Sequence, residues 1–221
     1  MCYCIAYYFP YFKMNTRQAY DIWASQYDTN SNKTRDLEAI ALRQTLIDFP
    51  FTHCLEIGCG TGKNTKWLLQ KANGITAIDL SDEMLVKARH KIEAEHVQFI
   101  QADITEEWTF VTTQYDLITF SLVLEHIKNL DLIFKKTSAA LKAGGYVYIG
   151  ELHPFKQYTG TKARFDTEEG RQIVPCFNHH ISDFITAAKK YGLALKDLNE
   201  FFDNNDRTNT PRILTILLQK A

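Results

Sequence analysis

The sequence predicts an α/β fold built on a doubly wound, Rossmann-like sheet. Short apolar runs recur through the middle of the chain and do not alternate polar with apolar residues. That pattern is typical of strands buried on both faces, as in a parallel sheet covered by helices. Helical segments separate the runs, and a regular strand–helix alternation implies right-handed crossovers. A glycine-rich loop follows the first run, at the position where folds of this class bind nucleotides.

Five strands and three intervening helices form the repeating part of the pattern. The strands are expected at residues 53–57, 75–78, 97–101, 117–120 and 146–149, and the helices at 64–71, 82–93 and 130–141. Ser81 is expected to cap the second of these helices, because its hydroxyl can accept from an exposed backbone N–H group. Gly144 and Gly145 are expected to end the third helix and lead into the fifth strand.

The segments that precede this pattern have a different character. Residues 15–50 are expected to form an N-terminal helical cap, with amphipathic helices at 16–28 and 35–48. Residues 1–14 are expected to be flexible or a translated extension, with the natural start near Met14. A hydrophobic N-terminal strap, or a tip that touches a membrane, is the alternative for this aromatic start.

After the fifth strand the strand–helix rhythm stops. Residues 151–178 are interpreted as an irregular insertion on the substrate side, and 180–190 as a helix. Two further strands, at 193–199 and 213–219, are joined by a polar turn, which predicts a hairpin. With no repeats and no low-complexity linker, we expect one domain over residues 1–221.

Composition excludes several classes of partner. The 25 basic and 26 acidic residues give a net charge of −1, so the chain lacks the basic footprint of a nucleic-acid binder. The cysteines number five, with no CxxC pair, which argues against a disulfide framework or a zinc cluster. His179 and His180 are adjacent and lack a third partner, so no metal site is expected. We expect a cytoplasmic protein with reduced thiols that binds neither nucleic acid nor membrane.

The glycine loop, Leu55-Glu56-Ile57-Gly58-Cys59-Gly60-Thr61-Gly62, is the most informative stretch. Glycines allow positive φ and close approach of the backbone to a ligand. The spacing is GxGxG and not the GxGxxG of dinucleotide sites. Glu56 in this loop would repel a pyrophosphate, whereas it can engage a cationic ligand.

Two further carboxylates close the next two strands. Asp79 ends the second strand about 20 residues after the loop, where a carboxylate can take both ribose hydroxyls. Asp103 closes the third strand, where it can accept from the exocyclic amine of an adenine; a strand-end cap is the alternative role.

Taken together, the motifs LEIGCGTG, AIDLSDEML, QADI, YDLITFSLVLEHI and LKAGGYVYIGE resemble those of the class I S-adenosylmethionine-dependent methyltransferases, in order and spacing, over roughly residues 15 to 150. The resemblance implies a seven-stranded sheet with an antiparallel last strand and S-adenosyl-L-methionine as the cofactor. It also implies that the first helix lies over the cofactor, where Tyr20, Trp23 and Tyr27 can close the cover.

The resemblance also assigns parts of the cofactor to particular residues. Glu56 and Gly58 would line the methionine end, Asp79 would hold the ribose, and Met84 would pack beside the adenine. Asp103 and Ile104 would complete the adenine pocket, and Ser121 would lie near the sulfonium. The predicted cofactor-binding residues are Tyr27, Glu56, Gly58, Gly60, Gly62, Asp79, Leu80, Met84, Asp103, Ile104 and Ser121.

Catalysis by such an enzyme is mostly positioning, because the methyl sulfonium carries the reactive group. An oxygen or nitrogen acceptor also loses a proton, which a histidine or carboxylate can take. His126, Glu151 and His153 are the candidates for this role. His126 can instead cap the next helix, and the insertion that begins at Glu151 can be a plain surface loop. Tyr158, Arg164 and Phe165 are expected to form a lid.

The acceptor itself is expected to be a small molecule that offers an oxygen, nitrogen or activated carbon nucleophile. Residues 121–124, Ser-Leu-Val-Leu, do not match the NPPY-type tetrapeptide of relatives that methylate amide nitrogens. Two alternatives stay open: a catalytically inactive cofactor-binding partner subunit, and a nucleotide-dependent oxidoreductase on a related fold. A monomer or a homodimer is expected.

Overall fold

The computed structural model describes residues 14–168 and 170–221 of the 221-residue chain. The aromatic segment that we expected to be flexible or a translated extension lies, apart from Met14, outside the described residues.

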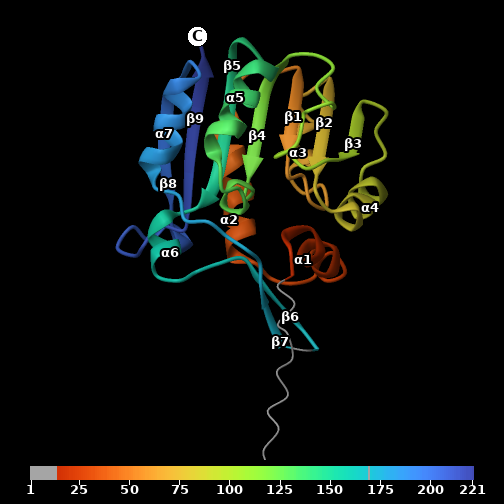
Figure 1. Cartoon of the computed structure of the whole chain (residues 1–221), viewed down its shortest axis with the longest axis vertical. Coiled ribbons are helices and arrows are strands. Elements are labelled where there is room, and N and C mark those ends of the chain that lie inside the picture. Colours follow the sequence, from red (N-terminus) through yellow and green to blue (C-terminus); the bar gives the residue numbers. More distant parts are fainter. Residues whose placement is uncertain (1–13, 169) are drawn as a thin grey trace, which may run out of the picture.

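Seven strands form one sheet in the order β3-β2-β1-β4-β5-β9-β8 (Figure 1). Neighbouring strands pair in parallel from β3 to β5, whereas β9 runs antiparallel to both β5 and β8. The strands are β1 (His53–Ile57), β2 (Gly74–Asp79), β3 (Val97–Gln101), β4 (Tyr115–Ser121), β5 (Leu141–Leu152), β8 (Leu193–Phe201) and β9 (Ile213–Lys220). The predicted Rossmann-like sheet with an antiparallel last strand is confirmed.

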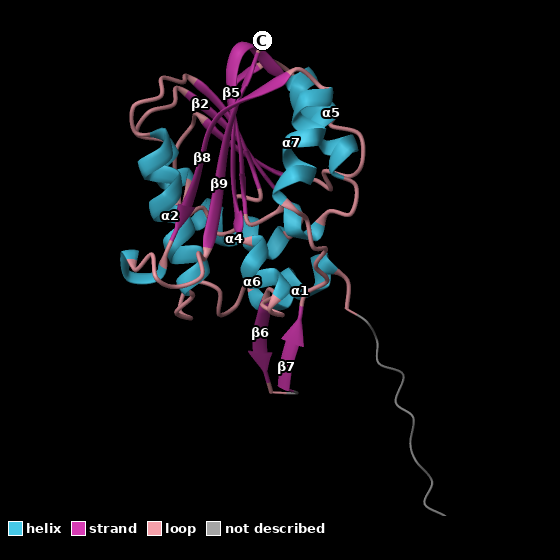
Figure 2. Ribbon diagram, turned by 90° about the vertical axis from the view of Figure 1, so that its left-hand side faces the viewer, coloured by secondary structure: helices cyan, strands magenta, loops and turns pink. Residues whose placement is uncertain are grey.

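Helices cover both faces of this sheet (Figure 2). One face packs against α2 (Lys33–Leu46), α3 (Thr65–Leu68) and α4 (Asp82–Lys91), and the other against α5 (Leu130–Ala140) and α7 (Ile181–Lys190). The central strands β1 and β4 therefore need apolar side chains on both faces, which explains their apolar runs, whereas the edge strands β3 and β8 are more exposed. The Ser81 side chain accepts from the Met84 N–H at 3.2 Å, so the predicted cap of α4 is confirmed.

Several helix ends differ from the prediction. The first helix, α1 (Thr16–Trp23), gives way to turns before Asp28, and α3 is only one turn long. The prediction that Gly144 and Gly145 end the third helix is wrong. Helix α5 ends at Ala140 and β5 starts at Leu141, because Leu141 already pairs with Tyr115 ahead of an irregularity in the ladder.

The insertion after β5 is more regular than predicted. Its first part is a short helix, α6 (Pro154–Tyr158), for which the His153 side chain accepts from the Phe155 N–H at 3.2 Å. Its second part is a hairpin of β6 (Arg164–Thr167) and β7 (Gly170–Ile173), which extends below the sheet in Figure 2. The Phe165 ring stacks on Trp23 with ring centroids 5.2 Å apart, so the hairpin is anchored to α1.

Two short 3₁₀ turns complete the described elements, η1 (Leu124–His126) after β4 and η2 (Asp203–Asn205) before β9. The second turn lies in the polar connection that was predicted between the last two strands. Within residues 14–168 and 170–221, no helix has the length and apolarity needed to cross a membrane.

Candidate cofactor-binding and active site

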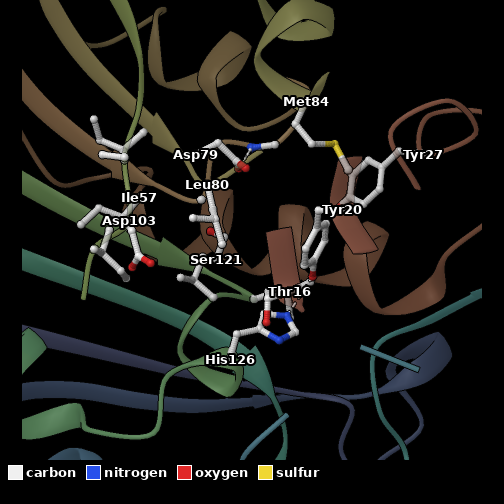
Figure 3. Close-up of a pocket in the computed structure, with 17 residues that line it drawn as sticks. Thr16, Tyr20, Tyr27, Ile57, Asp79, Leu80, Met84, Asp103, Ser121 and His126 are labelled. Atoms are coloured by element: carbon white, nitrogen blue, oxygen red, sulfur yellow. Dashed lines mark hydrogen bonds between the residues drawn. The ribbon is translucent and has the colours of Figure 1, made fainter. Parts of the chain in front are cut away.

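A cavity lies where the first four parallel strands end, beneath α1 (Figure 3). Parallel strands bring their carboxyl ends to one edge of the sheet, so residues far apart in sequence meet there. The lining residues are Thr16, Tyr20, Tyr27, Ile57, Gly58, Gly60, Ile78, Asp79, Leu80, Met84, Ala102, Asp103, Ile104, Ser121, Leu122, Val123 and His126. Nine of the eleven predicted cofactor-binding residues are therefore brought to one cavity.

The glycine loop forms one wall of this cavity and uses its own N–H groups to hold its shape. The N–H groups of Gly58 and Cys59 donate to the Ile78 carbonyl at 2.8 and 3.0 Å, and that of Gly60 donates to the Asp79 carboxylate at 2.8 Å. A pyrophosphate site needs such N–H groups free to point at the ligand. The loop is therefore built for close packing against a ligand and not for holding phosphate.

Two carboxylates face the cavity from neighbouring strand ends. Asp79 accepts from the Gly60 N–H and, at 2.9 Å, from the Ser81 N–H, and burial raises the pKa of its carboxyl to about 6. Each of its oxygens keeps a lone pair for a ligand hydroxyl. One oxygen of Asp103 accepts from the N–H and hydroxyl of Thr105, at 2.8 and 2.7 Å.

Glu56 and Gly62, two of the predicted cofactor residues, do not line the cavity. Glu56 is buried behind the loop, where its carboxylate accepts from the Thr65 hydroxyl at 2.6 Å. Gly62 has φ +82°, and a Cβ there would lie 2.8 Å from the end of the Ile92 side chain. Its role in this structure is to let the loop approach α4.

The buried Glu56 predicts that stability falls as the pH rises from about 5 to 8. Burial raises the pKa of Glu56 from 4.5 to about 8, so in this window the folded chain keeps a proton that the unfolded chain has lost. The stabilisation is complete at low pH and is lost as the pH rises through the folded pKa, at about 1.4 kcal/mol per pH unit for one group.

Urea unfolding of the wild type and of Glu56→Gln at pH 5.5 and 8 tests this expectation. The wild type should lose a few kcal/mol across the window, and the variant markedly less. Glu151 also has its pKa raised to about 8, so part of the slope should persist. The exposed Glu107→Gln is the control, and a Glu56→Gln slope as steep as the wild type's would contradict the prediction.

The aromatic side chains of α1 and the turn after it cover the cavity. Tyr20 and Tyr27 both line it, and the ring of Trp23 contacts both, with centroids 5.6 and 5.1 Å away. The Arg35 guanidinium lies over the outer side of this cover, 4.4 Å from the centroid of the Tyr27 ring. Aromatic faces attract cations, so this cover suits a sulfonium ligand.

His126 reaches the cavity from η1 and is held in one orientation. Its Nδ1 lies 2.7 Å from the Pro175 carbonyl, which can only accept, so Nδ1 carries the proton. Its Nε2 therefore has a free lone pair and accepts from the Tyr20 hydroxyl at 2.8 Å. Burial raises the pKa of Tyr20 well above its usual value, which keeps that hydroxyl protonated.

Glu125 and Cys176 lie beside His126. The ligand atoms of these three side chains are within 4.8 Å of one another, a spacing that a metal ion could use. Burial raises the pKa of the Cys176 thiol to about 12, so the thiolate that a metal prefers is disfavoured. One Glu125 oxygen is buried without a hydrogen-bond partner.

The structure does not bring Glu151 and His153 to the cavity. The Glu151 carboxylate is buried under η1, where it accepts from the N–H groups of Val123 and Leu124 at 3.0 and 2.7 Å. The His153 ring faces the other way, with Nε2 3.0 Å from the Glu200 carboxylate on β8. Of the three predicted catalytic residues, only His126 lines the cavity. Glu151 instead holds the turn that carries His126.

Some lining residues were missed because no side-chain chemistry marks them. Leu122 has φ +57° at the end of β4, and Val123 packs so closely on Gly58 that a Cβ there would lie 2.0 Å from it. Glu38 was also missed, although it is buried next to the site and bonded to Asn64 and Tyr148 at 3.0 and 3.1 Å. Its spacing from Leu42 on the buried face of α2 was the available signal.

The residues of the cavity fit S-adenosylmethionine. The ligand has no phosphate, and the N–H groups of Gly58, Cys59 and Gly60 are already bonded. It has a ribose and an adenine, for which Asp79 and Asp103 are placed on adjacent strand ends. It carries a sulfonium, and the aromatic cover offers faces for that charge.

Comparison with known proteins agrees with this fit. A family model described as a methyltransferase domain matches residues 55–149, from β1 into β5. The matched segment is therefore a methyltransferase domain of the S-adenosylmethionine-dependent kind, and its cofactor is S-adenosylmethionine. The motifs from which this resemblance was drawn lie largely within the matched segment.

The sequence identity of this methyltransferase to its relatives is low, but the similarity extends over most of each chain. An uncharacterised methyltransferase of Emericella nidulans is 24% identical over 94% of this chain and 86% of its own. A ubiquinone biosynthesis O-methyltransferase of Hydrogenovibrio crunogenus is 29% identical over 65% of this chain and 62% of its own. The N-methyltransferase NodS from Bradyrhizobium japonicum, solved with S-adenosylhomocysteine, shares the fold with a TM-score of 0.70 and 18% identity, over 94% of this chain and 99% of its own.

Proposed function

We propose that this methyltransferase transfers a methyl group to an oxygen, nitrogen or activated carbon atom of a small-molecule acceptor. The observation that carries the proposal is the single cavity in which Asp79, Asp103 and the Tyr20–His126 pair meet under α1. One relative is named an O-methyltransferase, and one structural neighbour is named an N-methyltransferase. Proteins similar to this chain therefore include enzymes for both kinds of acceptor atom.

The chain's residues divide the work of binding. Asp79 accepts from the ribose hydroxyls, and Asp103 accepts from the adenine amine. Met84, Leu80 and Ile104 would pack beside the adenine, and Ser121, at the end of β4, would lie near the sulfonium. The cofactor supplies an activated methyl group, and the protein holds the nucleophile about 3 to 3.5 Å from it and in line with sulfur.

The proton of an oxygen or nitrogen acceptor passes to His126. The acceptor hydroxyl donates to the Tyr20 oxygen as Tyr20 donates to the free Nε2 of His126, at 2.8 Å. Once protonated, the imidazolium lies 3.9 Å from the Glu125 carboxylate. His126 is thus the proposed base, and Glu151 is a positioning residue beneath it.

The two alternative functions are a nucleotide-dependent oxidoreductase and a catalytically inactive partner subunit. The bonded loop N–H groups disfavour a dinucleotide-dependent oxidoreductase. A catalytically inactive partner subunit would keep the same cofactor cavity, and only turnover separates it from an enzyme. We further propose a cytoplasmic chain of one domain, acting as a monomer or homodimer, in which the described cysteines Cys54, Cys59 and Cys176 stay free.

Calorimetric titration with S-adenosylmethionine, S-adenosylhomocysteine and NAD tests the proposal. Both adenosyl ligands are expected to bind in the micromolar range, whereas NAD is expected not to bind. Turnover would then be followed by the release of S-adenosylhomocysteine with small hydroxyl and amine acceptors. A preference for NAD, or failure of both adenosyl ligands to bind, would refute it.

A further inference from the structure

A second cavity, which we call the basic cavity, adjoins the cofactor cavity. It has a volume of about 320 Å³, and Tyr20, Tyr27 and Leu122 line both cavities. It therefore begins on the far side of the aromatic cover, next to the place proposed for the transferred methyl. A small molecule in it would reach the cofactor across these three residues.

The charge around the basic cavity is strongly one-sided. Five cationic side chains line it, and Glu125 is the one acidic residue in its wall. The cations come from three places: the start of α2, the insertion, and the start of β9; they are Lys33, Arg35, Lys162, Arg164 and Arg212. The whole chain has a net charge of −1, so this is a local concentration and not a general property.

Most of this positive charge is not neutralised by the protein. Within the described part of the chain, only Arg212 of these five pairs with a carboxylate, through two 2.6 Å contacts with Asp203. The Arg35 guanidinium donates to the backbone carbonyls of Tyr27 and Asn30. Carbonyls are neutral, so the positive charge of Arg35 is not compensated by these bonds. Lys33, Lys162 and Arg164 are exposed, so solvent and salt screen their mutual repulsion, and their charges remain available to pair with an anion.

A neutral donor in the same wall also lacks a partner. Trp23 is only 6% exposed and lines the basic cavity, and its indole N–H is buried without a hydrogen-bond acceptor. Because this N–H has almost no accessible surface, Trp23 offers the cavity its ring and not a hydrogen bond, and the cationic side chains are the groups that an anion would contact.

We propose that the basic cavity binds the anionic group of the methyl acceptor, a carboxylate or a phosphoryl group on the end that does not react. This inference rests on the proposed function, because it places the acceptor relative to the cofactor. The reacting end lies at Glu125 and Leu122, next to Tyr20 and His126. The anionic end lies toward Lys162 and Arg164, and the aromatic cover packs on the body between them.

The test compares three ring compounds on protein saturated with S-adenosylhomocysteine: benzoate, phenyl phosphate and benzyl alcohol. At least one of the two anions is expected to bind at least tenfold more tightly than the neutral alcohol, and the pair separates carboxylate from phosphoryl preference. In the double variant Lys162→Gln/Arg164→Gln, the preferred anion should lose tenfold or more in affinity. Arg171→Gln, on the same hairpin but outside the cavity wall, should leave it unchanged.

The affinity for S-adenosylhomocysteine is measured on every variant and separates the two levels of inference. If it binds normally but neither anion is preferred over the alcohol, the anionic subsite is wrong and the proposed function stands. If the double variant binds the preferred anion as tightly as the wild type, the anionic subsite is also wrong and the proposed function also stands. If S-adenosylhomocysteine does not bind to the wild type, the proposed function fails first.

Discussion

Replacing Gly58 with alanine is expected to destabilise the protein by about 3 kcal/mol and to abolish cofactor binding. Two costs add at this position. Gly58 has φ +74°, which L residues avoid, and the new Cβ would lie 2.0 Å from a methyl of Val123. The branched side chain of Val123 has few rotamers into which it can retreat, so the backbone of the loop or of the turn after β4 must shift.

Gly144 provides a matched control for the backbone part of this cost. It has nearly the same φ, +75°, but a Cβ there would have no atom within 4 Å. Gly144→Ala should therefore cost only about 1 kcal/mol and leave S-adenosylhomocysteine binding intact. Urea unfolding and calorimetry on both variants give the comparison. Equal losses of stability would show that the contact with Val123 is not what requires glycine at position 58.

The centre of the sheet was predictable because strands such as β1 and β4 are buried on both faces. Strands β1 and β3 were predicted with their observed bounds, since short apolar runs between helical segments are typical of strands covered on both sides. The hairpin of β6 and β7 was missed because its four-residue strands carry no such pattern. It is stabilised by the contact of Phe165 with Trp23, more than 100 positions away in the chain, and a local pattern does not contain that contact.

The site was predictable to the extent that topology determines it. Asp79 and Asp103 follow strand ends, and the carboxyl ends of parallel strands meet at one edge. Glu151 and His153 were also predicted at the carboxyl edge of the sheet, but the sequence did not reveal the hydrogen-bond partners of their side chains. The Glu151 carboxylate accepts from N–H groups of η1. The His153 ring is hydrogen-bonded to Glu200, which lies in the hairpin of β8 and β9. Such competition among polar groups is settled by tertiary packing and not by spacing.

Replacing Asp79 with alanine is expected to weaken the binding of S-adenosylhomocysteine about 100-fold or more. The carboxylate is the proposed acceptor for two ribose hydroxyls, and hydrogen bonds to a charged group contribute about 1.5 to 3 kcal/mol each. The side chain also ties the loop to β2 through Gly60 and Ser81. A loss of binding could therefore come from the ligand contact or from a loosened loop.

The pH dependence of binding separates these two causes. The pKa of Asp79 is raised to about 6, and ribose hydroxyls donate to its ionised form. Binding by the wild type should therefore be about tenfold weaker at pH 5 than at pH 7, because most of the carboxyl is protonated at the lower pH. Asp79→Asn cannot ionise, so its weaker binding should change little between these two pH values.

Ser81→Ala serves as the control for a loss of stability next to the site. It removes the 3.2 Å cap bond to the Met84 N–H and the 2.6 Å bond from the Ser81 hydroxyl to Asp21 on α1, but keeps the Asp79 carboxylate and the Ser81 N–H that donates to it. Its melting temperature should fall while the pH dependence of binding stays like that of the wild type. If Asp79→Asn kept the wild-type pH dependence, Asp79 would be a structural tie of the loop. A ribose contact would then have to be sought elsewhere on the wall of the cavity.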